Sequence, residues 1–533
     1  MQVLKNISLF VVLVLSLGHF TQAQDNVAQT YPPVFKWKVY AITVDSAGNQ
    51  YLTGGFNGTV DFNPGVGVDT KSSVGGGWDV FITRFNSDSS YAWTQTFGGS
   101  DSESGNGIAV SGDGQLYVTG SFSSNNAGIG SAGTFGTSGQ IDAFVLCLDA
   151  ATGQAVSNFG TGGIQKFGGT SLDYGYGITL GNNGRVYVSG YFYSTDSGIG
   201  GVGSFASTGG YDAFVLSLDA TSGLADSNFG TNGIQKFGGT NWDFCYGCVS
   251  AEINGRVYVA GQFSSNNAGI GGTGTITQSG GYDGFLICLD AATGVGFSGF
   301  GTGGVQKLTG NSEELPRGIV LGTNGRVYVA GFFSSTNMGI GVPGNVSPTG
   351  SIGSIDGFVL SLDSTTGQGD PNFGAGGIQK FGGTEIDVGS GISFGNNGRI
   401  YLTGKFESTD AGIGGSGSVS STTAGIYDAL ILSLDAATGQ GDSNFGTGGI
   451  QKFGGDQGDE GFAIAMSPSG VLYVAGLLGS TNAGVGGPGT YSTVGDFEGF
   501  HLPLDPATGQ MNQPPAVISQ PSATPNPITL TQP

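Results

Sequence analysis

The hydrophobic pattern of this chain repeats at a regular interval. An aromatic residue, an aliphatic residue, a small residue and a glycine follow one another in seven places. These copies open at Tyr51, Tyr117, Tyr187, Tyr258, Tyr328, Tyr401 and Tyr473. Successive copies are 66 to 73 residues apart, whereas the units of many repeat proteins are only about 20–50 residues long. We therefore expect one repeat domain in which every unit contains an insertion.

One unit, residues 176–237, contains four short apolar stretches, YGITL, RVYVSGYF, DAFVLSLD and GIQKF. Their apolar residues alternate or run continuously over four to eight positions without helical spacing, which is typical of strands. The sequence NNG before Arg185 and the sequence DATSG from Asp219 supply tight turns between them. The pattern predicts four-stranded antiparallel sheets and almost no helix.

The two ends of the repeat region indicate how the sheets are arranged. Residues 34–37 (VFKW) resemble a fourth strand, while the seventh copy ends after a third strand at Leu504. An N-terminal Velcro strand that completes the seventh sheet would close the ring and remove its exposed edges. The predicted fold is therefore all-β, a seven-bladed β-propeller of four-stranded antiparallel blades over residues 34–505. The proline-rich segment 506–533 is not expected to fold alone.

The segments GxGI, NGRVYVxGxF, DAFVLSLDxxTG and FGTGGIQKFGG give the chain a family resemblance. They resemble the bacterial SBBP-type β-propeller repeat and the related delta-sixty repeat, and the resemblance covers residues 34–505. It implies a propeller fold, but these families share no activity and no catalytic residues. The first copy departs most from the pattern, since it has DFNPG at residues 61–65 and no FGTGG segment.

The beginning of the chain predicts export. Lys5 precedes a nearly continuous apolar run over residues 7–17, and Ala23 is suited to cleavage. We interpret residues 1–23 as a signal peptide and residues 24–33 as a short leader, and expect a secreted or cell-surface monomer without membrane insertion.

Composition narrows the choice of partners. The chain has 107 glycines in 533 residues and a formal net charge of −22. This acidity argues against nucleic acid and anionic membrane surfaces as partners. An extracellular glycan or a surface protein is the expected partner, and a cation such as calcium is compatible with the charge.

Three sets of recurring residues are interpreted as structural. Lysines in the fourth strand are expected to line a solvated edge or to pair with residues such as Asp212, and arginines precede the second strand. Phenylalanines of the FGTGG segment are expected to pack between blades. The sets are Lys166, Lys236, Lys307, Lys380 and Lys452; Arg185, Arg256, Arg326 and Arg399; and Phe159, Phe229, Phe300, Phe373 and Phe445.

Catalytic residue types are scarce. His501 is the only histidine after the predicted signal peptide, and we expect it to pack or to face solvent rather than to act as a base. Cys147 and Cys288 are expected to be buried and apart. Cys245 and Cys248 either form a local disulfide or replace apolar strand residues, and no second pair or nearby histidine completes a zinc site.

Two connections of each blade are candidates for ligand binding, because they lie on the same face of a propeller. The connection before the inner strand is acidic, and we expect it to place carboxylates around the axial channel. Its candidate residues are Asp101, Glu103, Asp173, Trp242, Asp243, Glu313, Glu314, Asp387, Asp459 and Glu460. Asp173, Asp243, Asp387 and Asp459 could hold calcium, which prefers oxygen ligands; the alternative is that these acids are solvated turn residues.

The second connection is an insertion of about 18 residues with nearly the same sequence in most units. Such loops suit either repeated weak contacts or a structural rim. We therefore expect a non-enzymatic module for extracellular interaction that binds carbohydrate or protein through its loop face. The alternatives are a carboxylate-based glycosidase or lyase and a purely structural matrix protein. Aromatic residues clustered on the loop face would favour carbohydrate binding.

Overall fold

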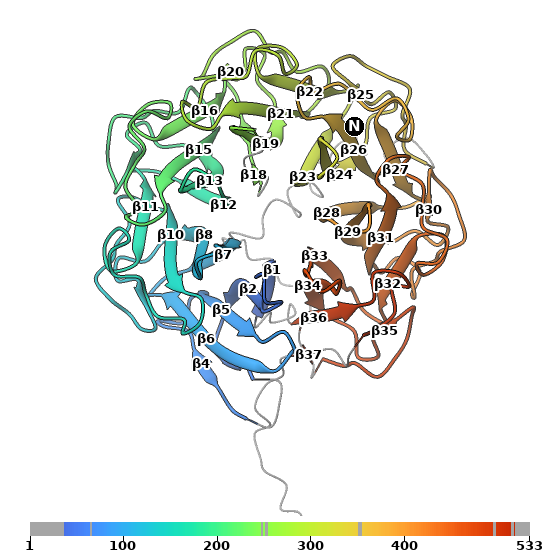
Figure 1. Cartoon of the computed structure of the whole chain (residues 1–533), viewed down its shortest axis with the longest axis horizontal. Helices are drawn as coiled ribbons and strands as arrows, with labels where there is room; N and C mark the ends of the chain where they lie inside the picture. Colours follow the sequence, from blue (N-terminus) through green and yellow to red (C-terminus); the bar gives the residue numbers. More distant parts are fainter. Residues whose placement is uncertain are drawn as a thin grey trace, which may run out of the picture.

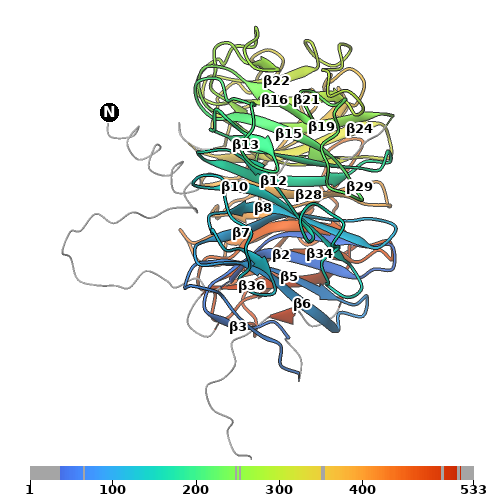
Figure 2. The ribbon, with the colours of Figure 1, turned by 90° about the vertical axis from the view of Figure 1, so that its left-hand side faces the viewer.

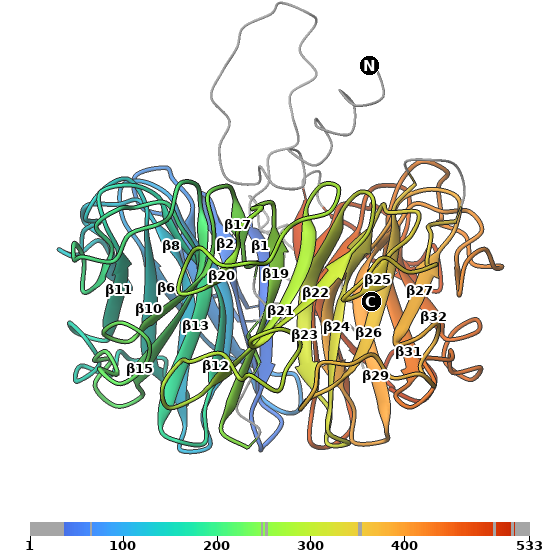
Figure 3. The ribbon, with the colours of Figure 1, turned by 90° about the horizontal axis from the view of Figure 1, so that it is seen from above.

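The chain forms a seven-bladed β-propeller, as the repeat pattern predicts (Figure 1). The computed structural model describes residues 37–63, 67–246, 249–250, 254–349, 354–493, 497–512 and 516–517. These residues contain no helix, and hence none long and apolar enough to span a membrane. The predicted signal peptide, the leader and most of the C-terminal segment lie outside the described residues. Side views show the blades packed into one disc (Figures 2 and 3).

Each blade places four antiparallel strands from the axis outward. The inner strands are β1 (Trp37–Val44), β7 (Glu103–Val110), β12 (Asp173–Leu180), β17 (Asp243–Phe244) with β18 (Val249–Ser250), β23 (Glu314–Leu321), β28 (Asp387–Phe394) and β33 (Glu460–Met466). The second strands are β2 (Gln50–Phe56), β8 (Gln115–Phe122), β13 (Arg185–Phe192), β19 (Arg256–Phe263), β24 (Arg326–Phe333), β29 (Arg399–Phe406) and β34 (Leu472–Leu478). The third strands are β5 (Asp79–Phe85), β10 (Asp142–Asp149), β15 (Asp212–Asp219), β21 (Asp283–Asp290), β26 (Asp356–Asp363), β31 (Asp428–Asp435) and β36 (Glu498–Leu504). The fourth strands are β6 (Tyr91–Gly98), β11 (Ile164–Gly168), β16 (Ile234–Gly238), β22 (Val305–Thr309), β27 (Ile378–Gly382), β32 (Ile450–Gly454) and β37 (Ala516–Val517).

The long insertion of one blade supplies a fifth strand to the preceding blade. In the third blade, for example, Gly198 and Ile199 pair with Gly168 and Phe167 at the outer edge of the second. These short strands are β9 (Gly128–Ile129), β14 (Gly198–Ile199), β20 (Gly269–Ile270), β25 (Gly339–Ile340), β30 (Gly412–Ile413) and β35 (Gly484–Val485). The insertions therefore form a structural rim that joins neighbouring blades and covers their edges. In the first blade a hairpin, β3 (Thr59–Asp61) and β4 (Thr70–Ser72), takes the place of this strand.

The prediction of an N-terminal Velcro strand is wrong. Trp37 belongs to the inner strand β1 and pairs with Phe56 of β2, while the outer strand of the seventh sheet is β37, which pairs with Phe500 and His501 of β36. The chain ends thus meet through side-chain packing: a methyl group added at Gly499 of β36 would lie 2.2 Å from the Trp37 ring. Trp37 replaces the acidic residue that opens the other inner strands, so the ring closes by apolar contact.

The repeated structural residues have the roles expected of them. Lys236 lies 3.3 Å from Asp212 of its own blade, and the other four lysines pair with the corresponding third-strand aspartates at 2.9–3.8 Å. Arg185, Arg326 and Arg399 form ion pairs on the opposite face. Arg256 instead lies 3.7 Å from the centre of the Phe297 ring, because phenylalanine replaces the acidic partner.

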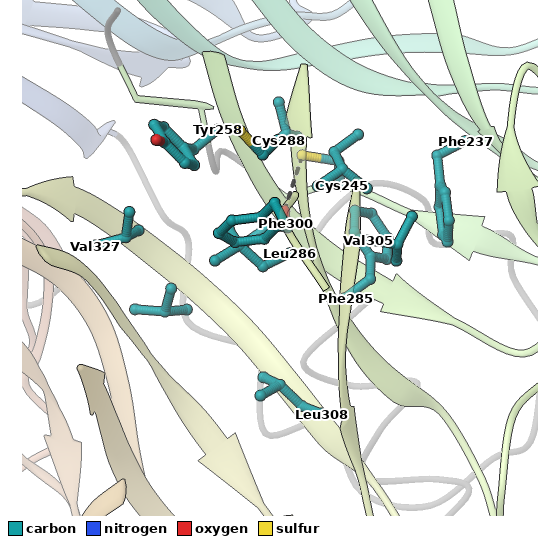
Figure 4. Close-up of a cluster of buried hydrophobic side chains, with 14 of the residues drawn as sticks. Phe237, Cys245, Tyr258, Phe285, Leu286, Cys288, Phe300, Val305, Leu308 and Val327 are labelled. Carbon is teal, nitrogen blue, oxygen red and sulfur yellow. Dashed lines mark hydrogen bonds between the residues drawn. The ribbon is translucent and has the colours of Figure 1, made fainter. Parts of the chain in front are cut away.

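The apolar core lies between the blades. Phe229 is fully buried and its ring centroid is 5.8 Å from that of Tyr187. The Tyr187 hydroxyl donates a 2.7 Å hydrogen bond to the Ala291 carbonyl of the next blade. Figure 4 shows the corresponding region of the next blade, where Phe300 packs among Leu286, Val305 and other buried side chains. A methyl group added at Gly294 of the next blade would lie 3.1 Å from the Phe229 ring, and the other four phenylalanines face a glycine of the next blade in the same way. The expected packing of these phenylalanines between blades is confirmed.

Phe229→Ala is expected to lower the free energy of unfolding by about 3–5 kcal/mol, because it opens a cavity between two blades. Leu224→Ala is the matched control, since Leu224 is 63% exposed and should change stability by less than about 0.5 kcal/mol. Urea denaturation of both variants measures the difference. An equal change in the free energy of unfolding for the two variants would show that Phe229 does not stabilise the contact between blades.

Candidate ligand-binding channel

The predicted acidic residues divide into a buried group and a surface group. The buried group is at most 2% exposed and does not line the channel, contrary to the expectation. It consists of Glu103, Asp173, Asp243, Glu314, Asp387 and Asp459. Asp101 is exposed, Glu313 is half-buried beside its loop, and only Glu460 and Trp242 line the central cavity.

The buried carboxylates organise the connection between blades. Asp243 accepts a 2.8 Å hydrogen bond from the backbone N–H of Gly239, which follows the fourth strand of the preceding blade. It also accepts a 2.7 Å bond from the hydroxyl of Ser265, which follows the second strand of its own blade. A carboxylate can accept both bonds at one point, and Asp173, Asp387 and Asp459 make the same two bonds at their blade boundaries. This explains the acid where the chain enters these inner strands.

Each of these acids lies near the third-strand aspartate of the preceding blade. Burial raises the pKa of Asp212 to about 6, with Lys236 opposing the shift and Asp243 adding to it. Burial likewise raises the pKa of Asp243 to about 6 despite its hydrogen bonds. One Asp212 oxygen is buried and has no hydrogen-bond partner in the described part of the chain.

The geometry gives no support to calcium at Asp173, Asp243, Asp387 and Asp459. Each is bonded within its own inter-blade connection, and the described residues contain no group of three histidine, cysteine or acidic side chains that could hold a metal ion. Their charges are used in hydrogen bonds to backbone and serine instead.

A cavity of about 710 Å³ lies around the axis, lined by residues of all seven blades. Six inner strands carry a register shift at the same position, and a bulge of this kind redirects a side chain. The residues at this position, with the equivalent Tyr246 of the fourth blade, are Tyr40, Asn106, Tyr176, Tyr246, Arg317, Ser390 and Phe462. All seven line the cavity.

Small residues next to the bulge let the inner strands approach. A methyl group added at Gly107 would lie 2.5 Å from the Tyr176 carbonyl oxygen of the next blade, and one at Gly391 would lie 2.9 Å from that of Phe462. The amide of Asn106 donates a 2.8 Å hydrogen bond to the Gly175 carbonyl across the same boundary. The narrow inner ring therefore fixes which side chains enter the channel.

Aromatic rings cover one side of the cavity. Tyr176 stacks on Tyr191 with centroids 5.4 Å apart, and Tyr191 contacts Phe244 at 4.9 Å. The rings continue through Tyr211 to Trp242 at the loop face, with centroids 6.3 Å apart. Trp242 is 53% exposed. The third and fourth blades thus form an aromatic wall, consisting of Tyr174, Tyr176, Tyr191, Tyr211, Trp242, Phe244, Tyr246 and Tyr282, from the channel to the surface.

Charged groups complete the lining. The Arg317 guanidinium lies over the rings of Tyr246 and Phe332, 4.9 and 5.4 Å from their centres. Lys405 pairs with Glu460 at 3.6 Å. Glu460 is the one carboxylate among the described residues that line the cavity, so this lining does not present the two carboxylates that glycoside hydrolysis uses.

Sequence reasoning found Trp242 and Glu460 but missed the rest of this site. When the seven inner strands are aligned, the acidic, glycine and isoleucine positions are nearly constant, while the second and fourth positions vary. The second position holds Lys38 and Leu315 in two blades and, in the other five, residues that line the cavity: Ser104, Tyr174, Phe244, Val388 and Glu460. The fourth position holds the bulged residues. Divergence at these positions within nearly identical repeats could have identified the channel.

The remaining candidates have structural surroundings. His501 is buried between the rings of Phe85 and Tyr473, at 5.5 and 5.1 Å, and burial lowers its pKa to about 4. The expected packing role is confirmed. Cys147 and Cys288 are buried, as expected. The Cys245 thiol donates a 3.2 Å hydrogen bond to the Ala260 carbonyl (Figure 4), and Cys248 lies outside the described residues.

Comparisons with known proteins place the chain in no family. No protein-family model matches it, so the resemblance to SBBP-type repeats stays a prediction. The regulatory protein FlaEY of Caulobacter vibrioides is 27% identical over 443 residues, covering 78% of this chain and 41% of that protein. The chain thus matches less than half of that relative's length.

Two solved structures align weakly. A glucose dehydrogenase has a TM-score of 0.30 and 11% identity over 64% of this chain and 90% of its own. The extracellular domain of a hybrid two-component system from B. thetaiotaomicron has a TM-score of 0.21 and 11% identity, over 90% of this chain and 56% of its own.

The buried carboxylates should make the protein more stable at pH 5 than at pH 8. Burial raises the pKa of Asp173, Asp212, Asp243, Asp356 and Asp459 to about 6, of Asp79 and Asp387 to about 7, and of Glu314 to about 8. The unfolded chain releases these protons near pH 4. The folded chain therefore holds more protons between about pH 4 and 8, and the free energy of unfolding falls as the pH rises through this range.

Thermal melts at pH 5 and pH 8 measure this effect, with Asp243→Asn as the matched variant. Its amide keeps the size of the side chain but does not titrate, so the difference between its two melting temperatures should be smaller than in the wild type. His501 opposes the trend only between about pH 4 and 6.5. A melting temperature that rises from pH 5 to pH 8 would contradict the prediction.

Proposed function

We propose that this chain is an exported, non-enzymatic binding module whose axial channel binds carbohydrate. The observation that carries the proposal is the aromatic wall, which runs from Tyr176 inside the channel to Trp242 on the loop face. Aromatic residues on the loop face are expected of a carbohydrate-binding propeller, and Trp242 is the exposed ring of this wall.

The lining has the composition that sugar recognition requires. A sugar ring presents apolar C–H faces, which pack on aromatic side chains, and hydroxyl groups, which need hydrogen-bond partners. The wall supplies rings with polar ends, since tyrosine combines an apolar body with a hydroxyl. Ser104, Asn106, Ser121 and Ser390 supply further donors and acceptors around the rest of the cavity.

The size of the cavity fits the same class of ligand. Its volume of about 710 Å³ lies within the roughly 300–1,000 Å³ typical of small-molecule sites. Because seven variable residues of the bulges surround one opening, the site is a single asymmetric pocket. The nearly identical insertions are engaged in sheet pairing, so repeated weak binding by these loops is the less supported alternative.

A glycan array with the mature protein tests the proposal, using Trp242→Ala as the variant. Trp242 is half exposed and contributes little to the core, so the variant should fold and should bind its glycan about tenfold more weakly through loss of stacking. Val295→Ala is the control, because Val295 is 61% exposed on a connection of the opposite face, and binding should not change.

The same array is read with calcium and with chelator. We expect equal binding in both, since the lining offers hydroxyl, amide, guanidinium and aromatic groups that can contact a sugar directly. Loss of binding in chelator would overturn this part of the proposal. Absence of any glycan signal, or equal binding by wild type and Trp242→Ala, would overturn carbohydrate binding in the channel.

A further inference from the structure

The distribution of basic residues indicates which kind of carbohydrate the channel takes. The chain has only 16 lysines and arginines against 38 acidic residues. Nine of the basic residues occupy repeated positions, the five fourth-strand lysines and the four arginines before the second strands, where their side chains contact neighbouring groups of the blade walls. These positions have a structural role.

Five described basic residues do not follow the repeat, and three of them belong to the innermost part of the ring. Lys71 pairs with Asp69 at 2.8 Å, and Arg84 donates a hydrogen bond to the Ala151 carbonyl. The others are Arg317 and Lys405, which line the cavity, and Lys38 on the inner strand β1, whose pKa burial lowers to about 8 while Glu460 opposes the shift. Among the described residues, Arg317 and Lys405 are thus the two unrepeated cations that line the cavity.

The balance of charge in the lining favours an anion. The described lining contains two basic residues, Arg317 and Lys405, and one acidic residue, Glu460, which lies 3.6 Å from Lys405. Arg317 occupies a bulged position, and its guanidinium lies over the rings of Tyr246 and Phe332. A guanidinium that stacks on aromatic rings is suited to bidentate hydrogen bonds with a carboxylate in its own plane. The aromatic wall lies next to it, through Tyr246.

We infer that the channel binds a glycan that contains uronic acid, with Arg317 binding the sugar carboxylate and the aromatic wall stacking on neighbouring sugar faces. This inference rests on the proposed function and adds the chemical class of the ligand. The net negative charge of the protein disfavours binding of an anion, and the positive charge of Arg317 offsets this repulsion within the channel. Anions whose shape keeps them from Arg317 should therefore bind more weakly.

The test is an array of matched pairs, in which oligosaccharides of galacturonic, glucuronic and mannuronic acid stand beside the same oligosaccharides with their carboxyl groups reduced to alcohols. Sulfated glycans without uronic acid are included. The mature wild-type protein should bind at least one acidic member tenfold or more tightly than its reduced counterpart. Raising the salt concentration should weaken binding of the acidic member and leave any binding of the reduced member unchanged.

Arg317→Gln should abolish the preference for the acidic member and leave residual binding to both. Arg326→Gln is the matched control. Arg326 lies 3.1 Å from Asp370 and does not line the channel. The preference of this variant for the acidic member should equal that of the wild type, even if the variant is less stable. Arg317→Lys keeps the charge without the planar donor set and should show an intermediate preference.

The outcomes separate this inference from the proposed function. Equal binding of acidic and reduced members, a preference only for sulfated glycans, or an acidic preference that survives in Arg317→Gln would overturn the inference and leave carbohydrate binding standing. No binding to any member, acidic or neutral, would overturn both.

Discussion

The close approach of neighbouring inner strands around the axis is the constraint on which this molecule depends. At Gly107 and Gly391 a single added methyl group would collide with the backbone of the next blade. Seven sheets can therefore surround one axis only if the positions that face a neighbouring strand are small. The bulge beside these positions turns one residue per blade into the central space, so ring closure and the lining of the channel have the same physical cause.

The outer part of the ring is constrained differently. The insertions pair with the fourth strand of the preceding blade, as Ile199 does with Phe167, and each pairing needs the same short glycine-containing sequence. This requirement explains why the longest loops are the least variable. Function in a propeller is usually sought in its loops, but here the loops maintain the edges of the sheets and the variation lies in the strands that face the axis.

Many acidic side chains of this protein lie at the boundaries between blades. Acids such as Asp243 receive hydrogen bonds from two chain segments at a blade boundary, and Lys236 partly neutralises the neighbouring Asp212. Much of the acidity is therefore internal and structural, and it does not describe the surface that a ligand meets. The channel has the opposite character, with aromatic rings and the guanidinium of Arg317.

The sequence by itself determined the number of blades, the order of strands in a typical blade and the packing of Phe229 between blades, because each follows from a local pattern that recurs in register along the chain. For Lys236 the sequence left two roles open, a solvated edge or a pair with Asp212, and the structure shows the pair. Only the tertiary structure decided that Ala516–Val517 completes the seventh sheet, that the acids of the inner connections are buried, and that Tyr176 and its equivalents line one cavity. The physical reason is that these features depend on residues far apart in the chain. A strand's alternation shows which side chains share a face, whereas closure of the ring decides whether that face meets a neighbouring blade, a chain end or open space.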